Sequence, residues 1–284
     1  MRFLCLVGAS APLTCSVGQS PIPRSVSRSY NSAISLSPMS RSQQPQRRII
    51  YDIGSNNGDD IPYYLLKADS VVAVEANPSL CDQISARFPR EIETGRLSLV
   101  NAALVDTDDK VVDFYVHNKH HVLSSLDPGE RHEDEYSKQQ VNAVNICSLV
   151  QRYGDPYYVK IDVEGFDRQI LASFHSHSIR PAYISAESHK IGVFALLAEE
   201  MNYQSFKLVD GRSVGAVYKK TLFHSPVLDK MVAYSFPHHS AGPFGNDIFG
   251  EWMDKSTLLR YLSIQGLGWK DIHASAVDPA TLKS

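Results

Sequence analysis

Short apolar runs alternate with amphipathic segments along most of the chain. The runs have the length and the β-branched content of buried strands, and glycine, asparagine or charged residues bound them. They lie at residues 49–53, 71–75, 97–100, 157–161 and 182–186. Apolar residues at helical spacing predict helices between them, at 59–67, 78–88, 165–174 and 190–201. This alternation predicts an α/β fold with a doubly wound, mostly parallel sheet.

Two regions depart from the alternation. Residues 111–118 alternate apolar and polar positions like a hairpin strand, and a charged loop follows at 129–138. We expect an insertion or a lid there. Residues 203–209 and 214–219 are predicted to form an antiparallel strand pair that closes the sheet.

Composition divides the chain into three parts. Residues 1–48 are rich in serine and arginine and contain no acid, which is typical of a disordered or targeting segment. Three interpretations fit: an organellar transit peptide, a weak secretory signal at Phe3–Val7, or translation that begins at Met39. Residues 49–223 are the predicted domain. Residues 224–284 are dense in aromatic residues, which are costly to leave in water, so an ordered cap is favoured over a disordered tail.

Charge and composition argue against some classes of binding partner. The 284 residues are 43% hydrophobic and carry a formal net charge of −3. This balance provides no basic field for a nucleic acid, and no apolar run approaches the ~18 residues of a membrane-spanning helix. The four cysteines lack metal-ligand spacing. We expect a globular protein of the cytoplasm, or of an organelle stroma or matrix if the N-terminal segment is a transit peptide.

A glycine-rich turn follows the first predicted strand. It reads D-x-G-x-N-x-G, with Asp52, Gly54, Asn56 and Gly58 at the defined positions. Dinucleotide folds instead place G-x-G-x-x-G around a pyrophosphate. The acids at 59–60 open the predicted helix; they repel phosphate but suit the positive sulfonium and α-amino groups of S-adenosylmethionine.

Glu75 ends the second predicted strand, about twenty residues after the turn, where a carboxylate can accept hydrogen bonds from both hydroxyls of a ribose. Together, the glycine turn and Glu75 predict a site for an adenosyl cofactor. The structural alternative is a tight turn in which glycine and asparagine only tolerate a left-handed backbone.

Acids and a histidine follow the fourth and fifth predicted strands. Asp162 and Glu164 come after the fourth strand, and Glu187 and His189 after the fifth. Ligands of doubly wound sheets bind at the carboxyl ends of the strands, so we expect these side chains near the reactive end of the cofactor. The carboxylates can orient the cofactor, hold an acceptor, take a proton or bind Mg²⁺. Their structural alternative is to stabilise the N-terminus of the following helix.

A hydroxyl acceptor must lose its proton as it is methylated. His189 is the candidate base because its ordinary pKa lies near neutrality, and a surface histidine is the alternative. Ser124 and Ser125 can bond a cofactor carboxylate, or can belong to a simple loop turn. Further histidines with no metal-ligand spacing, expected at the surface, are His117, His120 and His121.

Five segments, DIGSNNGDD, VVAVEANP, LVNAALVD, LSSL and VKIDVEGFDRQIL, occur in the order and spacing of one family. Over about residues 50–190 the chain resembles the FkbM-type family of S-adenosylmethionine-dependent methyltransferases. The resemblance implies a class I methyltransferase (Rossmann-like) fold and mostly O-methylation, with acceptors that include hydroxyls of sugars and polyketides. At Ile146–Leu149 the chain reads ICSL, where the family has T-L-D.

The resemblance also implies roles for individual residues. Those that line the methionine moiety are Asp52, Gly54, Asn56 and Gly58. Glu75 binds the ribose, and Asn101 with Ala102 lies at the adenine edge. Asp162 and Glu164 lie at the transfer site, and Ser125 is counted with the cofactor residues.

These observations predict an S-adenosylmethionine-dependent methyltransferase that methylates a hydroxyl of a small molecule or glycan. One alternative is a catalytically silent methyltransferase-like binding module. Another is a nucleotide-dependent oxidoreductase, which the missing G-x-G-x-x-G disfavours. A divalent metal is compatible with the sequence but not indicated by it, and neither a nucleic acid nor a membrane is expected as a partner.

Overall fold

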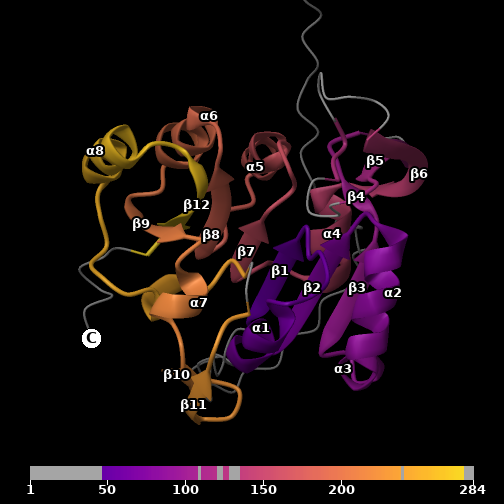
Figure 1. Cartoon of the computed structure of the whole chain (residues 1–284), viewed down its shortest axis with the longest axis horizontal. Helices are drawn as coiled ribbons and strands as arrows, with labels where there is room; N and C mark the ends of the chain where they lie inside the picture. The colour runs from indigo at the N-terminus through magenta and orange to yellow at the C-terminus, as the bar shows by residue number, and fades with distance from the viewer. Residues whose placement is uncertain (1–46, 108–109, 120–123, 128–134, 238–239, 278–284) are drawn as a thin grey trace, which may run out of the picture. The chain divides into compact units, whose positions relative to one another are not determined.

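The five apolar runs form neighbouring parallel strands in a computed structural model (Figure 1). These strands are β1 (Ile49–Ile53), β2 (Ser70–Glu75), β3 (Leu97–Asn101), β7 (Tyr158–Ile161) and β8 (Tyr183–Ser188). β1 pairs with both β2 and β7, so it lies at the middle of the parallel part. The predicted α/β fold with a mostly parallel sheet is confirmed.

The structure describes residues 47–107, 110–119, 124–127, 135–237 and 240–277. The prediction of a disordered or targeting segment at 1–48 concerns residues that, apart from Arg47 and Arg48, lie outside the described ones. Residues from Arg47 onward belong to one compact unit.

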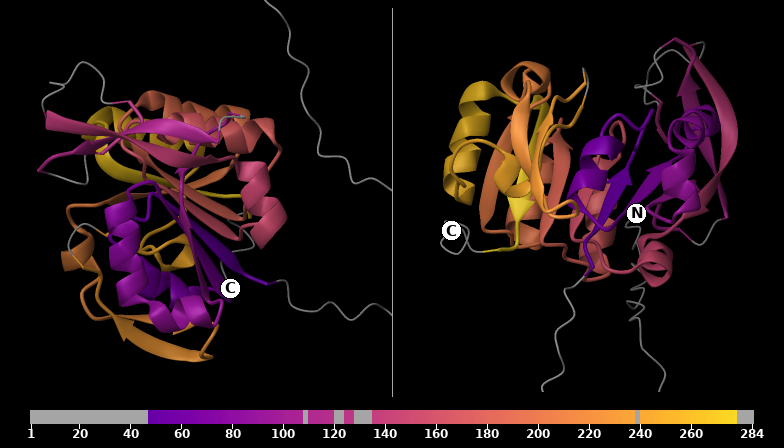
Figure 2. Two further views of the ribbon diagram at one scale, coloured as in Figure 1. Left: turned by 90° about the vertical axis from the view of Figure 1, so that its right-hand side faces the viewer. Right: turned by 90° about the horizontal axis from the view of Figure 1, so that it is seen from below.

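Helices cover both faces of the central sheet (Figure 2). One face packs against α4 (Ile146–Tyr153), α5 (Asp167–Ser176), α6 (Ile191–Ala195), the π-helical turn η3 (Leu196–Glu200) and α8 (Lys255–Gln265). The other packs against α1 (Ile61–Lys67), α2 (Pro78–Arg87), α7 (Val214–Val217) and the 3₁₀ turn η4 (Gly245–Asp247). The short helix α3 (Pro89–Glu93) follows α2. No helix in the described part of the chain is long and apolar enough to cross a bilayer.

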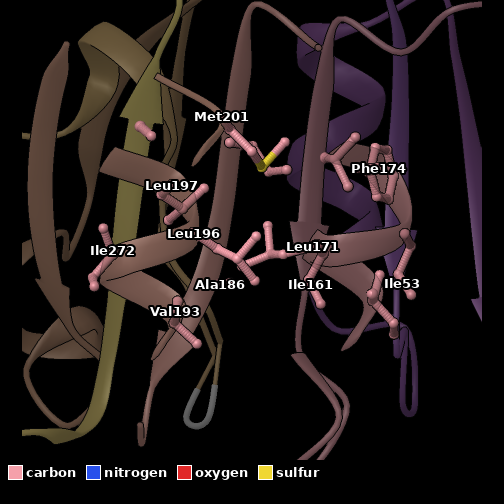
Figure 3. Packing of buried hydrophobic residues seen from close by; sticks show 14 of the residues in the cluster. Ile53, Ile161, Leu171, Phe174, Ala186, Val193, Leu196, Leu197, Met201 and Ile272 are labelled. Atoms are coloured by element: carbon pink, nitrogen blue, oxygen red, sulfur yellow. The ribbon is translucent and has the colours of Figure 1, made fainter. Parts of the chain in front are cut away.

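Branched aliphatic side chains fill the space between the sheet and α5, α6 and η3 (Figure 3). Ile161 and Ala186 project from β7 and β8 toward Leu171 of α5 and Leu196 of η3, and each of the four is at most 1% exposed. This packing fixes β7 and β8, whose carboxyl ends carry the predicted acids, relative to β1.

The predicted closing strand pair is wrong in one partner. β9 (Ser205–Asp210) forms as expected, but residues 214–217 form helix α7. The strand beside β9 is β12 (Gly268–Ser275), which runs antiparallel to both β8 and β9 and separates them. β9 is therefore the edge strand of the sheet, and its strand partner comes from the C-terminal segment rather than from residues 214–219.

The segment 224–284, expected as a cap, thus contributes a strand to the interior of the sheet. Its Phe236 and Phe244 are buried on the α1 face, whereas Phe249 is 57% exposed. β11 (Lys230–Tyr234) pairs with β10 (Thr221–Ser225) in a two-stranded hairpin. Phe236 and Phe244 are therefore part of the core, and Tyr234 and Trp252 pack against it.

A second, smaller sheet lies beyond the carboxyl end of β3. It consists of β4 (Ala103–Leu104), β6 (Tyr136–Val144) and β5 (Val111–His117), in that order. β5 confirms the strand predicted at 111–118. Its partner β6 was not predicted, and its first residues fall within the segment expected to be a charged loop at 129–138.

Candidate functional site

A cavity of about 740 Å³ opens at the carboxyl ends of β1, β2, β7 and β8. Its walls come from the loop after β1, the end of β2, residues 102–104 and 124–126, and the loop after β7. Glu187, His189 and Trp269 complete it. The sequence placed its two predicted clusters at these strand ends, and the structure brings both into one cavity.

Gly54 begins the loop after β1 with a φ of +78°. A Cβ atom there would lie 1.9 Å from the carbonyl oxygen of Asp162, so the loop packs directly on the end of β7. Asn56 is also left-handed, with a φ of +50°. Gly58 does not line the cavity; a Cβ at that position would meet the side chains of Ile61, Ile84 and Phe88. The glycines therefore serve close approach and packing.

Glu75 lines the cavity and is 7% exposed. Its Oε2 accepts a hydrogen bond from the backbone amide of Asn56, and its Oε1 accepts one from that of Asn77, each at 2.8 Å. Burial raises the pKa of Glu75 to about 7, although the two amide hydrogen bonds favour the ionised form. The carboxylate thus holds the β1 loop against the end of β2.

Asn101 and Ala102 occupy different positions. The amide of Asn101 donates hydrogen bonds to the carbonyl oxygens of Glu75 at 3.0 Å and Ala76 at 3.1 Å, and its side chain does not line the cavity. Ala102 lines it. Asn101 therefore supports the end of β2, and Ala102 forms part of the cavity wall.

Asp52 lies beneath the cavity floor rather than in its lining. It is fully buried, and neither carboxylate oxygen accepts a hydrogen bond from the residues that the structure describes. The ammonium of Lys160 lies 3.5 Å from its Oδ1. Burial raises the pKa of Asp52, and the charge of Lys160 opposes that effect. Asp52 thus contacts Lys160, a residue of the cavity lining, without lining the cavity itself.

The acids at 59–60 lie before α1, which begins at Ile61 rather than at residue 59. Asp60 accepts hydrogen bonds from the Ser240 hydroxyl and the Ala241 backbone amide. Burial raises the pKa of Asp60 to about 6. Asp59 lines the cavity and accepts a hydrogen bond from the side chain of Asn57 at 2.9 Å. Asp60 therefore fixes the 240–241 segment.

The predicted transfer residues meet at one end of the cavity. Carboxylate oxygens of Asp162, Glu164 and Glu187 all lie within 4.8 Å of one another, a separation at which they could hold a divalent cation. The hydroxyl of Ser125 lines the cavity and donates a hydrogen bond to the backbone carbonyl of Glu164 at 2.7 Å. Ser125 thus links the smaller sheet to the loop after β7.

Glu187 and His189 form a pair at the end of β8. The Nδ1 atom of His189 lies 3.0 Å from Oε2 of Glu187; the histidine side chain is 44% exposed and the glutamate 6%. Burial, followed by the charges of Asp162 and Asp271, raises the pKa of Glu187 to about 10. The two side chains are thus in direct contact at the edge of the cavity.

Several lining residues were not predicted. Lys160 faces the cavity from β7, but in the sequence it is one polar residue in an apolar strand. Trp269 reaches the cavity from β12, whose position in the sheet has no local sequence signal. A Cβ at Gly211 would lie 2.5 Å from its indole Nε1, so the glycine permits the indole to pack there.

The histidines near the smaller sheet are only partly described. His117, expected at the surface, is 8% exposed and packs edge-on against Tyr136 at 5.0 Å between ring centroids. That expectation was wrong because the ring is covered by Tyr136, its cross-strand neighbour on β6. His120 and His121 lie outside the described residues. Ser124 lines the cavity, and its hydroxyl accepts a hydrogen bond from the backbone amide of His117 at 3.1 Å.

Comparison with known proteins gives one match to a family. The model of the methyltransferase FkbM domain matches residues 52–208, more than half of the chain. This range includes the loop after β1, Glu75 and the Asp162–Gly165 segment. No curated protein matches the chain.

Solved structures with similarity to the chain include three enzymes. A precorrin-6y C5,15-methyltransferase from Geobacter metallireducens has 12% identity and a TM-score of 0.33, over 59% of this chain and 69% of that one. CalS10, an amino pentose methyltransferase from Micromonospora echinaspora, has 11% identity and a TM-score of 0.27, over 51% of this chain and 44% of that one. Spermidine synthase from Thermotoga maritima has 9% identity and a TM-score of 0.35, over 84% of this chain and 57% of that one.

Proposed function

Because the chain belongs to the FkbM family of methyltransferases, we propose that it transfers a methyl group from S-adenosylmethionine to a hydroxyl oxygen of a small molecule or glycan. The observation that carries this proposal is a single cavity lined both by the Gly54 loop with Glu75 and by the Glu187–His189 pair. A cofactor site and a candidate base thus share one space.

The residues at the β1 and β2 ends fit an adenosyl cofactor. Gly54 allows the backbone to approach Asp162 where any Cβ would collide, and Glu75 presents a carboxylate at the strand end suited to ribose hydroxyls. When bound, S-adenosylmethionine supplies an electrophilic methyl group, whose transfer breaks the sulfur–methyl bond and forms an oxygen–methyl bond. The cavity lining contains six acids and two lysines, a balance that favours a positively charged ligand.

His189 takes the proton of the acceptor hydroxyl in this proposal. Glu187 holds the imidazole through Nδ1 and so fixes the ring plane at the cavity edge. Asp162 and Glu164 accept hydrogen bonds from the acceptor and hold its oxygen in line for transfer. Trp269 provides an apolar wall beside the pair.

Calorimetry with S-adenosylmethionine, followed by transfer of a radiolabelled methyl group to fractionated cell extract, tests the proposal. Nuclear magnetic resonance of the labelled product distinguishes a methoxy carbon from an N-methyl carbon. We expect binding and a methoxy product. Binding of the cofactor with no labelled product in any fraction supports the silent binding module, and binding of NAD in its place supports the oxidoreductase.

A further inference from the structure

Lys160 connects the two halves of the cavity. Its ammonium lies 3.0 Å from the carbonyl oxygen of Gly54 and 3.2 Å from Oδ2 of Asp162. It also lies 3.5 Å from Oδ1 of Asp52. One cation thus contacts the loop expected to hold the cofactor and the carboxylate expected at the transfer end.

The environment of Lys160 is buried and acidic. The residue is 4% exposed, and its side chain lines the cavity. Burial alone would lower the pKa of the ammonium, but Asp162, Asp52, Asp60 and Asp271 together raise it well above its usual value. The group is therefore a fixed positive charge.

Asp162 depends on this contact for its position. Its side chain is 43% exposed, so solvent leaves it several rotamers unless a partner selects one. The backbones of Gly54 and Asp162 pack so closely that a Cβ on Gly54 would lie 1.9 Å from the Asp162 carbonyl oxygen, and the lysine donates its hydrogen bond to Gly54 at that same junction. Loss of the ammonium would remove both its hydrogen bond to Gly54 and its ion pair with Asp162.

We propose that Lys160 is a positioning residue that holds Asp162 against the Gly54 loop and sets the preference of the cavity for a sulfonium ligand over a neutral thioether. The inference rests on the proposed function. With the ammonium present, part of the negative charge of Asp162 is offset. Without it, a sulfonium ligand experiences more of that charge, whereas a thioether does not respond to it.

The test compares the affinities of S-adenosylmethionine and S-adenosylhomocysteine by calorimetry at pH 8 in the wild type and in variants. In K160M we expect the ratio of the two affinities to shift toward the sulfonium ligand by about threefold or more. K160R retains the charge, so its ratio should stay within about twofold of the wild type. General damage to the fold would weaken both ligands alike and leave the ratio unchanged.

Lys207 provides the matched control. It is also buried, at 5% exposure, on the same face of the sheet, in the register row that runs from Asp52 and Lys160 through Ser185 and His273. It does not line the cavity. K207M should therefore keep the wild-type ratio of affinities. This result would show that the shift in K160M comes from the position of Lys160 and not from the loss of any buried lysine.

The outcomes distinguish a failure of the role of Lys160 from a failure of the proposed function. An unchanged ratio in K160M, with both ligands bound, overturns the role of Lys160 and leaves the proposed function intact. Binding of neither ligand by the wild type contradicts the proposed function and the inference with it. If K160M does not fold, the double variant D52N/K160M removes both charges of the buried pair. The ratio of its two ligand affinities is then compared with the ratio for D52N.

Discussion

The carboxylate of Glu75 accepts a hydrogen bond from the backbone amide of Asn56 at 2.8 Å, so the end of β2 determines the shape of the loop that follows β1. The partner hydrogen bond from Asn77 anchors the same carboxylate to the start of α2. A residue expected to bind ribose therefore also organises the backbone that surrounds it. Substitutions at Glu75 will act through both roles.

Glu75→Gln should weaken the binding of S-adenosylmethionine by about tenfold to a hundredfold, because hydrogen bonds to a charged acceptor are lost or inverted. Calorimetry measures the effect. Glu93→Gln changes an exposed acid of α3 and should leave the affinity unchanged. An unchanged affinity in Glu75→Gln would remove Glu75 from the cofactor site.

Gly54→Ala should abolish detectable binding of the cofactor, since the new Cβ would lie 1.9 Å from the Asp162 carbonyl oxygen. The control is Gly266→Ala, which has a similar φ, +74° against +78°, but has nothing within 4 Å of the new atom. Both variants also strain the backbone, since each glycine has a positive φ that alanine rarely adopts. If both bind the cofactor equally, the close approach at Gly54 has no role in binding.

His189→Ala should remove the acidic limb of the pH–rate profile for methyl transfer, measured with the acceptor found in extract. A base must be deprotonated to act, so the wild-type rate rises with pH as the Glu187–His189 pair loses its proton. Cofactor affinity should persist in the variant. His175→Ala, an exposed position on α5, is the control. Retention of the limb in His189→Ala assigns the base to another group.

Asp167→Asn should stabilise the apo protein at pH 8. Burial, followed by the charge of Asp162, raises the pKa of Asp167 to about 8 from its ordinary value of 3.8. The folded state therefore keeps a proton that the unfolded state loses, and the stability present below pH 3.8 is lost as the pH rises through about 8.

Denaturant titrations between pH 5 and 8 measure this effect. We expect Asp167→Asn to exceed the wild type by ~1–3 kcal/mol at pH 8 and to differ less at pH 5. Asp229→Asn changes a side chain that is 99% exposed and should follow the wild type. A variant curve parallel to that of the wild type would show that Asp167 does not retain its proton.

Deletion of residues 1–46 should leave the affinity for S-adenosylmethionine within about twofold and the melting temperature within about 2 °C of the full chain. β1 begins at Ile49, and the first cavity-lining residue is Ile53. Calorimetry and thermal unfolding measure the two quantities. A large loss of either would make this segment part of the folded unit.

The parallel strands β1, β2, β7 and β8 were predictable because each is buried on both faces and so reads as a largely apolar run. The pairing of strands that lie far apart in the sequence was not predictable. Residues 214–219 have strand-like composition, but the position beside β9 belongs to β12, some sixty residues later in the chain. Nothing local in either segment distinguishes the two partners.

The candidate site follows the same division. Glu75 and Asp162 were placed correctly at the cavity because strand ends can be read from the sequence. Asp52 shares the motif of the glycine turn, yet the alternation of the strand directs its side chain beneath the floor, toward Lys160. Trp269 could not be predicted, since its contribution depends on where β12 inserts.

The insertion of β12 between β8 and β9 has a consequence for biosynthesis. A ribosome releases the chain from its N-terminus, so β9 emerges long before β12. In the described structure β9 pairs with no strand other than β12. Throughout that interval the nascent sheet ends at β8 with an unsatisfied row of amides and carbonyls, a surface to which other chains can add. Protection of this edge by chaperones would therefore matter until residue 275 has left the exit tunnel.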